Sequence, residues 1–185
     1  MVSPEAFVAD LAAAHIGDTF NQYARGPRAL LLRDRLARYL ESRADASFVL
    51  VGEAPGYRGA RISGIPFTSE RQLTGSGPAE ATATIVHRVL AELGIAESAL
   101  LWNVVPTHPG TESSNRRPTR SEIGSGQRYV LALTVGRSVV AVGRLAQEVC
   151  RGGLPVRHPS HGGGRAFQAG LVELLDRGDV LPGPA

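Results

Sequence analysis

Three polar side chains of the kinds that catalyse hydrolysis stand near the ends of separate apolar runs in this sequence. Glu53 follows one run, Asn103 lies near the end of a second, and His158 follows another. A carboxylate, an amide and an imidazole that meet in one crevice are suited to hydrolysis, because they can activate water and stabilise developing charge. This chemistry requires a fold that brings the three positions together.

Four short runs predict the strands that would position these groups, namely residues 48–51, 100–105, 138–142 and 154–157. Helical patterns lie between them, and strands that alternate with helices pack as a parallel sheet covered on both faces. We therefore expect a three-layer α/β/α sandwich with a central four-stranded parallel sheet, in a single domain that spans residues 1–185. Such sheets bind ligands at the carboxyl ends of their strands, where the three polar groups are expected.

Apolar spacing and end signals predict the helices. They are expected at residues 3–16, from residue 27, and at 79–93, 119–135, 144–150 and 165–175. In the second helix the predicted buried stripe consists of Leu30, Leu31, Leu36 and Leu40. Thr119 and Glu122 form a capping-box pattern, and Pro155 predicts that the last strand lies at an edge of the sheet. Residues 52–78 are expected to form a long loop, and loops of that length tend to be functional.

The composition limits the class of protein. The 185 residues have a net charge of +3, and every basic residue is arginine. An arginine-only surface suits nucleic acid, although a GC-rich genome would also favour arginine over lysine. The single cysteine, Cys150, excludes an internal disulfide and any four-cysteine zinc or iron–sulfur site.

The sequence lacks several common signals. No signal peptide and no apolar run approaching ~18 residues is present, so we expect a cytoplasmic protein that makes no membrane contact. Neither a nucleophile elbow nor a Walker loop occurs. Glu53, His158 and His161 could approach a metal, but their spacing matches no known ligand pattern. We therefore expect no metal and no other cofactor.

Short motifs accompany the expected strand ends. They are GEAPG at residues 52–56, Phe67 within Ile-Pro-Phe, WNVV at 102–105, the segment 109–119, the turn at 142–147 and His-Pro-Ser at 158–160. Together they resemble the uracil-DNA glycosylase superfamily over most of the chain. The resemblance implies a monofunctional DNA glycosylase, a monomer, that hydrolyses the N-glycosidic bond of deoxyuridine. Uracil-containing DNA would be its partner, and free uracil and an abasic site its products.

The resemblance also implies catalytic and base-reading roles. Glu53 would hold or activate the attacking water, and His158 would hydrogen-bond uracil O2 as negative charge develops on the leaving base. Phe67 would stack on the flipped base. Asn103 would donate to O4 and accept from N3–H, a pattern that cytosine reverses. Three more substrate-binding positions are expected: Gly52, Ala54 and Tyr57, the last against the C5 methyl group of thymine.

DNA contacts are expected around the same motifs. The candidates are Arg58, Arg61, Gly143, Arg144, Ser160, His161 and Arg165. The family often inserts a leucine wedge after the last motif. This chain has a glycine-rich loop there, so His161 or Arg165 would enter the duplex instead. His108 is a further candidate for a DNA contact, whereas Arg116 and Arg117 are expected to be solvated.

The chain departs from the best-known branch of the family at two points. Ala54 stands where that branch has a catalytic aspartate, and the lone cysteine rules out the cluster-bearing branch. The chain is therefore expected in a bacterial branch without an iron–sulfur cluster, with its acid at Glu53.

Alternatives to this assignment stay open. Taken alone, Glu53 could be an ion-paired surface residue, Asn103 a turn residue and Phe67 part of the core. The protein as a whole could be a non-catalytic or product-trapping relative that binds uracil or abasic sites in DNA. It could also be an unrelated α/β hydrolase or nucleotide-binding module.

Overall fold

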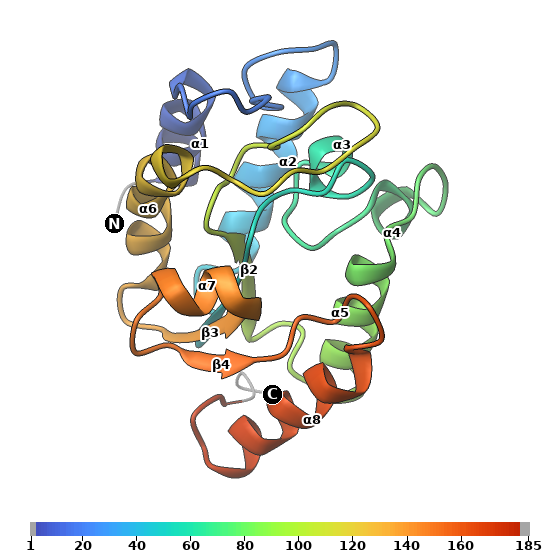
Figure 1. The fold of residues 1–185 in the computed structure, drawn as a ribbon, viewed down its shortest axis with the longest axis vertical. Helices are drawn as coiled ribbons and strands as arrows, with labels where there is room; N and C mark the ends of the chain where they lie inside the picture. The colour runs from blue at the N-terminus through green and yellow to red at the C-terminus, as the bar shows by residue number, and fades with distance from the viewer. Residues whose placement is uncertain (1–2, 182–185) are drawn as a thin grey trace.

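The computed structural model describes residues 3–181, and a parallel β-sheet forms its centre (Figure 1). The strands are β1 (Phe48–Gly52), β2 (Ala99–Asn103), β3 (Ser138–Val142) and β4 (Leu154–Val156), in the spatial order β2-β1-β3-β4. Every neighbouring pair is parallel, which requires long crossover connections such as the predicted helices. The predicted four-stranded parallel sheet is confirmed.

Helices cover both faces of the sheet and complete the predicted three-layer sandwich (Figure 1). One face is covered by α1 (Pro4–Ala13), α2 (Ala29–Ser42), α6 (Arg120–Thr134) and α7 (Gly143–Val149). The other is covered by α5 (Ala81–Glu92) and α8 (Gly164–Asp176). Successive strand residues point to opposite faces, so Val49 and Val51 pack on the first face and Phe48 and Leu50 on the second. Each fully buried side chain of this size contributes about 1.5–3 kcal/mol.

Side-chain hydrogen bonds set both ends of α1. The helix begins where Ser3 Oγ accepts a hydrogen bond from the Ala6 N–H at 3.2 Å. It ends at Ala13, before the predicted end, because Asn21 Nδ2 donates to the Leu11 carbonyl at 2.8 Å and so satisfies a helix-terminal acceptor.

Two local predictions are confirmed. The Thr119 hydroxyl accepts from the Glu122 N–H at 3.2 Å and the Glu122 carboxylate accepts from the Thr119 N–H at 2.8 Å, which completes the capping box of α6. The strand that contains Pro155 lies at the edge of the sheet, as expected for a residue without an N–H. Among the helices of residues 3–181, none has the length and apolar character that a membrane crossing requires.

The predicted buried stripe of α2 is wrong at two positions. Leu30 and Leu31 are 77% and 43% exposed, respectively. The helix buries Ala29 and Leu32 instead, together with the other two predicted leucines. Positions 29, 32, 36 and 40 recur every three or four residues and share one helix face, whereas residues 30 and 31 are rotated away from it.

The predicted loop of residues 52–78 contains two short helices, α3 (Ala60–Ser63) and α4 (Glu70–Thr74). α4 begins with a capping box between Ser69 and Gln72 and ends at Gly75, whose φ is 76°. The Ser-x-x-Gln spacing and the terminal glycine are the signals that could have predicted this helix.

Candidate active site

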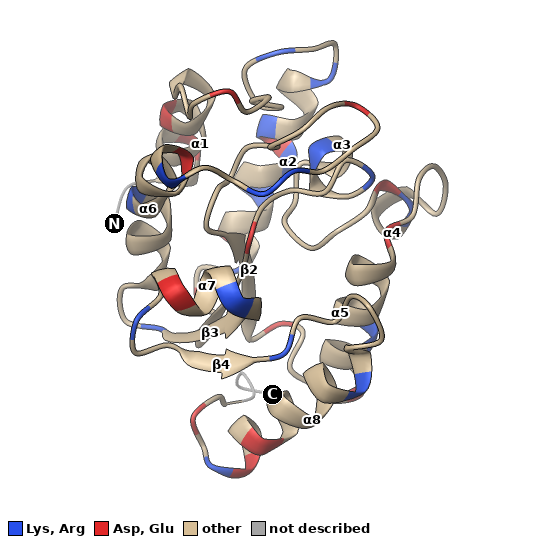
Figure 2. Cartoon of the chain, in the orientation of Figure 1, with Lys and Arg blue, Asp and Glu red and all other residues tan. Residues whose placement is uncertain are grey.

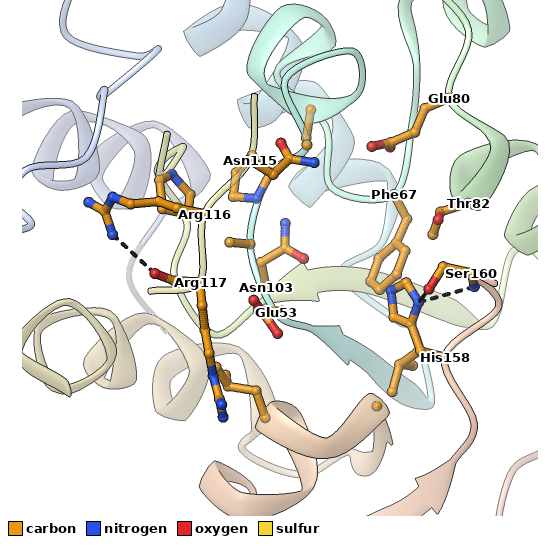
Figure 3. A pocket seen from close by; sticks show the side chains of 18 of the residues that line it. Glu53, Phe67, Glu80, Thr82, Asn103, Asn115, Arg116, Arg117, His158 and Ser160 are labelled. Carbon is orange, nitrogen blue, oxygen red and sulfur yellow. Dashed lines mark hydrogen bonds between the residues drawn. The ribbon is translucent and has the colours of Figure 1, made fainter. Parts of the chain in front are cut away.

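A cavity of about 530 Å³ lies at the carboxyl edge of the sheet (Figure 3). Its volume falls within the range of small-molecule sites. Glu53 follows β1, Asn103 ends β2, Gly143 follows β3 and His158 lies beyond β4, and all four line the cavity. The structure therefore brings the carboxylate, the amide and the imidazole together, because parallel strands end at one edge of the sheet.

Asn103 presents a free amide to the cavity. It pairs with Gly52 in the sheet register, which fixes its height along the strand, and it is only 3% exposed. Within residues 3–181 no hydrogen bond is made to its side chain, although the side chain lines the cavity. Buried amides are almost always hydrogen-bonded, so this amide is available to a ligand that both accepts and donates.

Phe67 forms an aromatic wall of the cavity (Figure 3). It is 7% exposed and its backbone is left-handed, with φ at 53°, an uncommon conformation for an aromatic residue that costs about 1–3 kcal/mol. The following residue is held from two sides. Thr68 Oγ1 lies 2.9 Å from His87 Nε2, and the Thr68 carbonyl accepts a hydrogen bond from Ser63 Oγ at 2.6 Å. These contacts fix the segment that positions the ring.

The carboxyl group of Glu53 is partly buried in the cavity, and desolvation raises its pKa. The guanidinium of Arg117 acts in the opposite direction and lowers that pKa, while the carboxylate of Glu148 raises it. Arg117 and Glu148 lie 3.7 Å apart as a surface ion pair. These two exposed charges therefore shift the pKa of the partly buried Glu53 in opposite directions. A raised pKa makes Glu53 a better proton acceptor than an ordinary surface carboxylate.

Ser160 holds the ring of His158 in one tautomer (Figure 3). The Ser160 N–H donates to His158 Nδ1 at 3.1 Å, and Ser160 Oγ lies 2.7 Å from the same atom. Because Nδ1 accepts the backbone hydrogen bond, the proton of the neutral ring is on Nε2. Burial lowers the pKa of His158, and the positive charges of Arg157 and His161 lower it further. The neutral ring can therefore donate from Nε2 at pH 7.

Four of the predicted DNA-binding residues lie at the cavity: Gly143, Arg144, Ser160 and His161. Arg144 and His161 are exposed. Gly143 has a φ of 80°, and a Cβ atom there would lie 3.1 Å from His158 Cβ, so glycine permits the close approach of the two segments. Figure 2 shows arginines both on α7 and on the loop before α6, and Arg144, Arg116 and Arg117 of these segments line the cavity.

The other three predicted DNA-binding residues do not line the cavity. Arg58 and Arg165 are exposed elsewhere on the surface. Arg61 donates to Glu112 at 2.9 Å, its guanidinium lies 5.0 Å from the centre of the Phe20 ring, and its side chain is only 13% exposed. The sequence alone did not reveal these two partners of Arg61.

Of the remaining predicted substrate-binding residues, one lines the cavity and two do not. Ala54 lines the cavity, whereas Gly52 lies behind the ring of Phe67. The side chain of Tyr57 is not part of the lining. Its N–H donates instead to Asn115 Oδ1 at 2.9 Å, so this residue contributes through its backbone.

Sequence reasoning missed several residues that line the cavity: Glu80, Thr82, Asn115, Arg116 and Arg117. The expectation that both arginines are merely solvated is wrong for Arg116, which donates to the buried Glu122 carboxylate at 2.5 and 2.8 Å. Glu80 stands at the N-cap of α5 without capping it. The short side chains of Ser, Thr, Asp and Asn are preferred at that position, so the longer glutamate was the available signal of another role.

The prediction that His108 touches DNA is wrong. The side chain is fully buried, with Nδ1 2.8 Å from the Pro55 carbonyl and Nε2 2.8 Å from the Thr111 carbonyl. It ties the loop after β1 to the loop after β2 and so supports the wall of the cavity. In the described part of the chain, no three His, Cys, Asp or Glu side chains converge in a way that could hold a metal ion.

Comparisons with known proteins agree with this architecture. A family model described as the uracil DNA glycosylase superfamily matches residues 40–181, well over half of the chain. Among solved structures, the crystal structure of wild-type SMUG2 from Pedobacter heparinus is similar, with a TM-score of 0.67 and 12% sequence identity, over 96% of this chain and 98% of that chain. At this identity the likeness shows the fold alone. No curated protein sequence matches the chain.

Proposed function

The chain belongs to the uracil DNA glycosylase superfamily, and on this premise we propose that it hydrolyses the N-glycosidic bond of deoxyuridine in DNA. The products are free uracil and an abasic site. The sequence contains no lysine, so no lysine Schiff base can form, and attack by water is the route that its residues support. The target base must leave the DNA stack to reach the cavity.

The observation on which the proposal rests is the free amide of Asn103. It is 3% exposed, has no partner within residues 3–181 and lines the same cavity as the Phe67 ring. The amide can donate to uracil O4 and accept from N3–H while the base stacks on the ring. Cytosine would oppose both hydrogen bonds, and each buried unpaired group would cost about 1–3 kcal/mol.

Bond cleavage follows from the two titratable groups of the cavity. As the bond between the sugar and N1 breaks, positive charge develops on the sugar and negative charge on uracil. The Glu53 carboxylate offsets the first charge and accepts a proton from the attacking water. His158 donates from Nε2 to uracil O2 and stabilises the second.

A direct test uses an oligonucleotide with one labelled deoxyuridine and the protein as purified. We expect release of uracil, and strand cleavage after alkali treatment of the product. Glu53→Gln should abolish release while a gel shift with the same DNA persists. A gel shift by the wild type without any product would support a non-catalytic relative instead, and absence of both would refute a role on uracil-containing DNA.

A further inference from the structure

Gln147 of α7 joins the carboxyl ends of the two strands that precede Gly143 and His158. The helix lies against β3 and β4 (Figure 1). Gln147 Nε2 donates to the Val156 carbonyl of β4 at 3.1 Å and to the Ala141 carbonyl of β3 at 3.4 Å. The side chain is half-buried and does not line the cavity. One amide therefore connects two strand ends from outside the cavity.

The end of β4 has few other hydrogen bonds to hold it. The strand has three residues, one of which is Pro155, and in the described part of the chain its only neighbour in the sheet is β3. Proline has no N–H to donate. Val142 and Val156 form the last pair of the register, after which β3 passes directly into α7. The Val156 carbonyl therefore lies where the ladder ends, and the Gln147 amide supplies a donor for it.

The position of His158 depends on this strand end. His158 stands two residues beyond Val156, and a Cβ atom on Gly143 would lie 3.1 Å from His158 Cβ, so the chain at His158 passes close to the start of α7. The hydrogen bond from the Ser160 N–H to Nδ1 orients the ring within its own loop. It does not fix that loop relative to the sheet, and the two bonds of Gln147 supply this second constraint.

We propose that Gln147 is a positioning residue for His158, which it holds beside Gly143 through the carbonyl of Val156. The proposal rests on the proposed function, in which the ring donates from Nε2 to uracil O2. A displacement of about 1 Å in such a group lowers the rate by about 100-fold. Since Gln147 lies outside the cavity lining, its effect on catalysis passes through the histidine.

Gln147→Met tests the role in kinetics, because it keeps the length of the side chain and removes the amide. We expect kcat for uracil release to fall by about 10–100-fold and KM to stay within about twofold, since the contacts proposed for Phe67 and Asn103 are unchanged. Gln168→Met removes an exposed amide that donates to Glu92 at 3.2 Å. This control should leave both constants unchanged, and a wild-type kcat in Gln147→Met would overturn the proposal.

A double-mutant cycle tests whether the effect passes through His158. We expect Gln147→Met to cause no further loss of rate in a protein that already carries His158→Ala. A loss by the same factor in both backgrounds would show that Gln147 acts on the site independently of the histidine, and would overturn the proposed role.

A measurement without DNA separates failure of this proposal from failure of the proposed function. Burial is the main cause that lowers the pKa of His158, ahead of the charges of Arg157 and His161. A ring released from its place should therefore have a pKa closer to the ordinary histidine value. NMR titration of the nitrogen-labelled protein should show a higher pKa for His158 in Gln147→Met than in the wild type.

Val149→Ala is the control for a purely structural effect. It shortens a half-buried apolar side chain at the end of the same helix, so it should lower the free energy of unfolding and leave the pKa of His158 unchanged. The same pKa in Gln147→Met and wild type would overturn the positioning role even if uracil is released. A raised pKa in a protein that releases no uracil would support the positioning of His158 and refute the proposed function alone.

Discussion

The ring of Phe67 occupies the space that a side chain at position 52 would need. A Cβ atom on Gly52 would collide with Phe67 Cζ, lie 2.8 Å from Cε2 and stand 3.0 Å from Asn103 Oδ1. The glycine that begins the GEAPG motif thus permits the Phe67 ring and the Asn103 amide, the proposed base reader, to approach one strand end together. Gly52 leaves room for the Phe67 ring and the Asn103 side chain. It therefore lies behind the ring and does not line the cavity itself.

Gly52→Ala should therefore displace the ring and impair catalysis more than folding. We expect kcat/KM for uracil release to fall by about 100-fold, since a shift of about 1 Å in a positioning group has that effect, and the free energy of unfolding to fall by about 1–3 kcal/mol. Kinetics on a deoxyuridine oligonucleotide and urea unfolding measure the two. Gly124→Ala is the control, because a Cβ atom in that part of α6 meets no neighbour and should stabilise the helix slightly.

Asn103→Asp should reverse the pattern read at the Watson–Crick edge. The ionised side chain cannot donate to uracil O4, so uracil release should fall by about 10–100-fold. Relative to that rate, release of cytosine should rise, because a carboxylate accepts from the cytosine amino group. Parallel assays on oligonucleotides with uracil and with cytosine measure the ratio. The same selectivity in variant and wild type would refute Asn103 as the reader.

Part of this site could be predicted from the sequence and part could not. The convergence of Glu53, Asn103 and His158 follows from topology, because each stands at the end of a strand and parallel strands end at one edge. Glu80 and Asn115 lie at the cavity for a different reason. They come from a helix N-cap and a long loop, whose positions depend on tertiary contacts such as that between His108 and Pro55.

The errors of prediction have the same physical origin. Arg116 was expected to be solvated from its residue type, but its surroundings depend on Glu122, a buried partner in the first turn of α6. The partner of Arg61, Glu112, could not be predicted from residue type either. Leu30 was assigned to the buried stripe of α2 from apolar spacing, but the helix phase places Ala29 and Leu32 on the buried face instead. Periodicity and strand-end position predict the fold well, whereas ion-pair partners require the packed structure.

The charge of Glu53 should control the acid limb of the pH–rate profile. Burial raises the pKa of this carboxyl group. Since the proposed reaction uses the ionised carboxylate, single-turnover rates should fall with decreasing pH through a pKa above the usual glutamate value. Arg117 lowers that pKa, so Arg117→Ala should move the limb to higher pH, and Glu148→Gln should move it to lower pH. Arg120→Ala, an exposed change at the start of α6, is the control. If Arg117→Ala and Glu148→Gln shifted the acid limb in the same direction, or left it unchanged, Glu53 would not be the group that titrates in it.

His158 should be neutral, with its proton on Nε2, throughout the neutral range. Nitrogen chemical shifts of the labelled protein should report the Nε2–H tautomer, and protonation should occur below the usual histidine range because burial lowers the pKa. His161→Ala removes a neighbouring charge that contributes to the lowering, so the pKa of His158 should rise. His15→Ala, an exposed substitution, serves as the control. His158→Ala should slow uracil release by about 100–1,000-fold while DNA binding persists.

The buried carboxylate of Glu122 should make stability depend on pH below neutrality. Arg116 donates to both of its oxygens, the Thr119 N–H donates as well, and the pKa falls to about 2 from an ordinary value of 4.5. The stabilisation is therefore complete above about pH 4.5 and is lost as pH falls toward 2. Since each pKa unit corresponds to about 1.4 kcal/mol, the contribution is on the order of 3 kcal/mol.

Glu122→Gln should remove this contribution and flatten the pH dependence of the unfolding free energy in the same window. Urea unfolding at several pH values measures both effects. Glu92→Gln is the matched control, because its ion pair with Arg88 is about half exposed on each side and should contribute under about 1 kcal/mol. The ion pair of Glu122 also anchors the loop that holds Asn115 and Arg117, so the variant should lose uracil release before it unfolds. Full activity in a destabilised variant would show that the loop is held by other contacts.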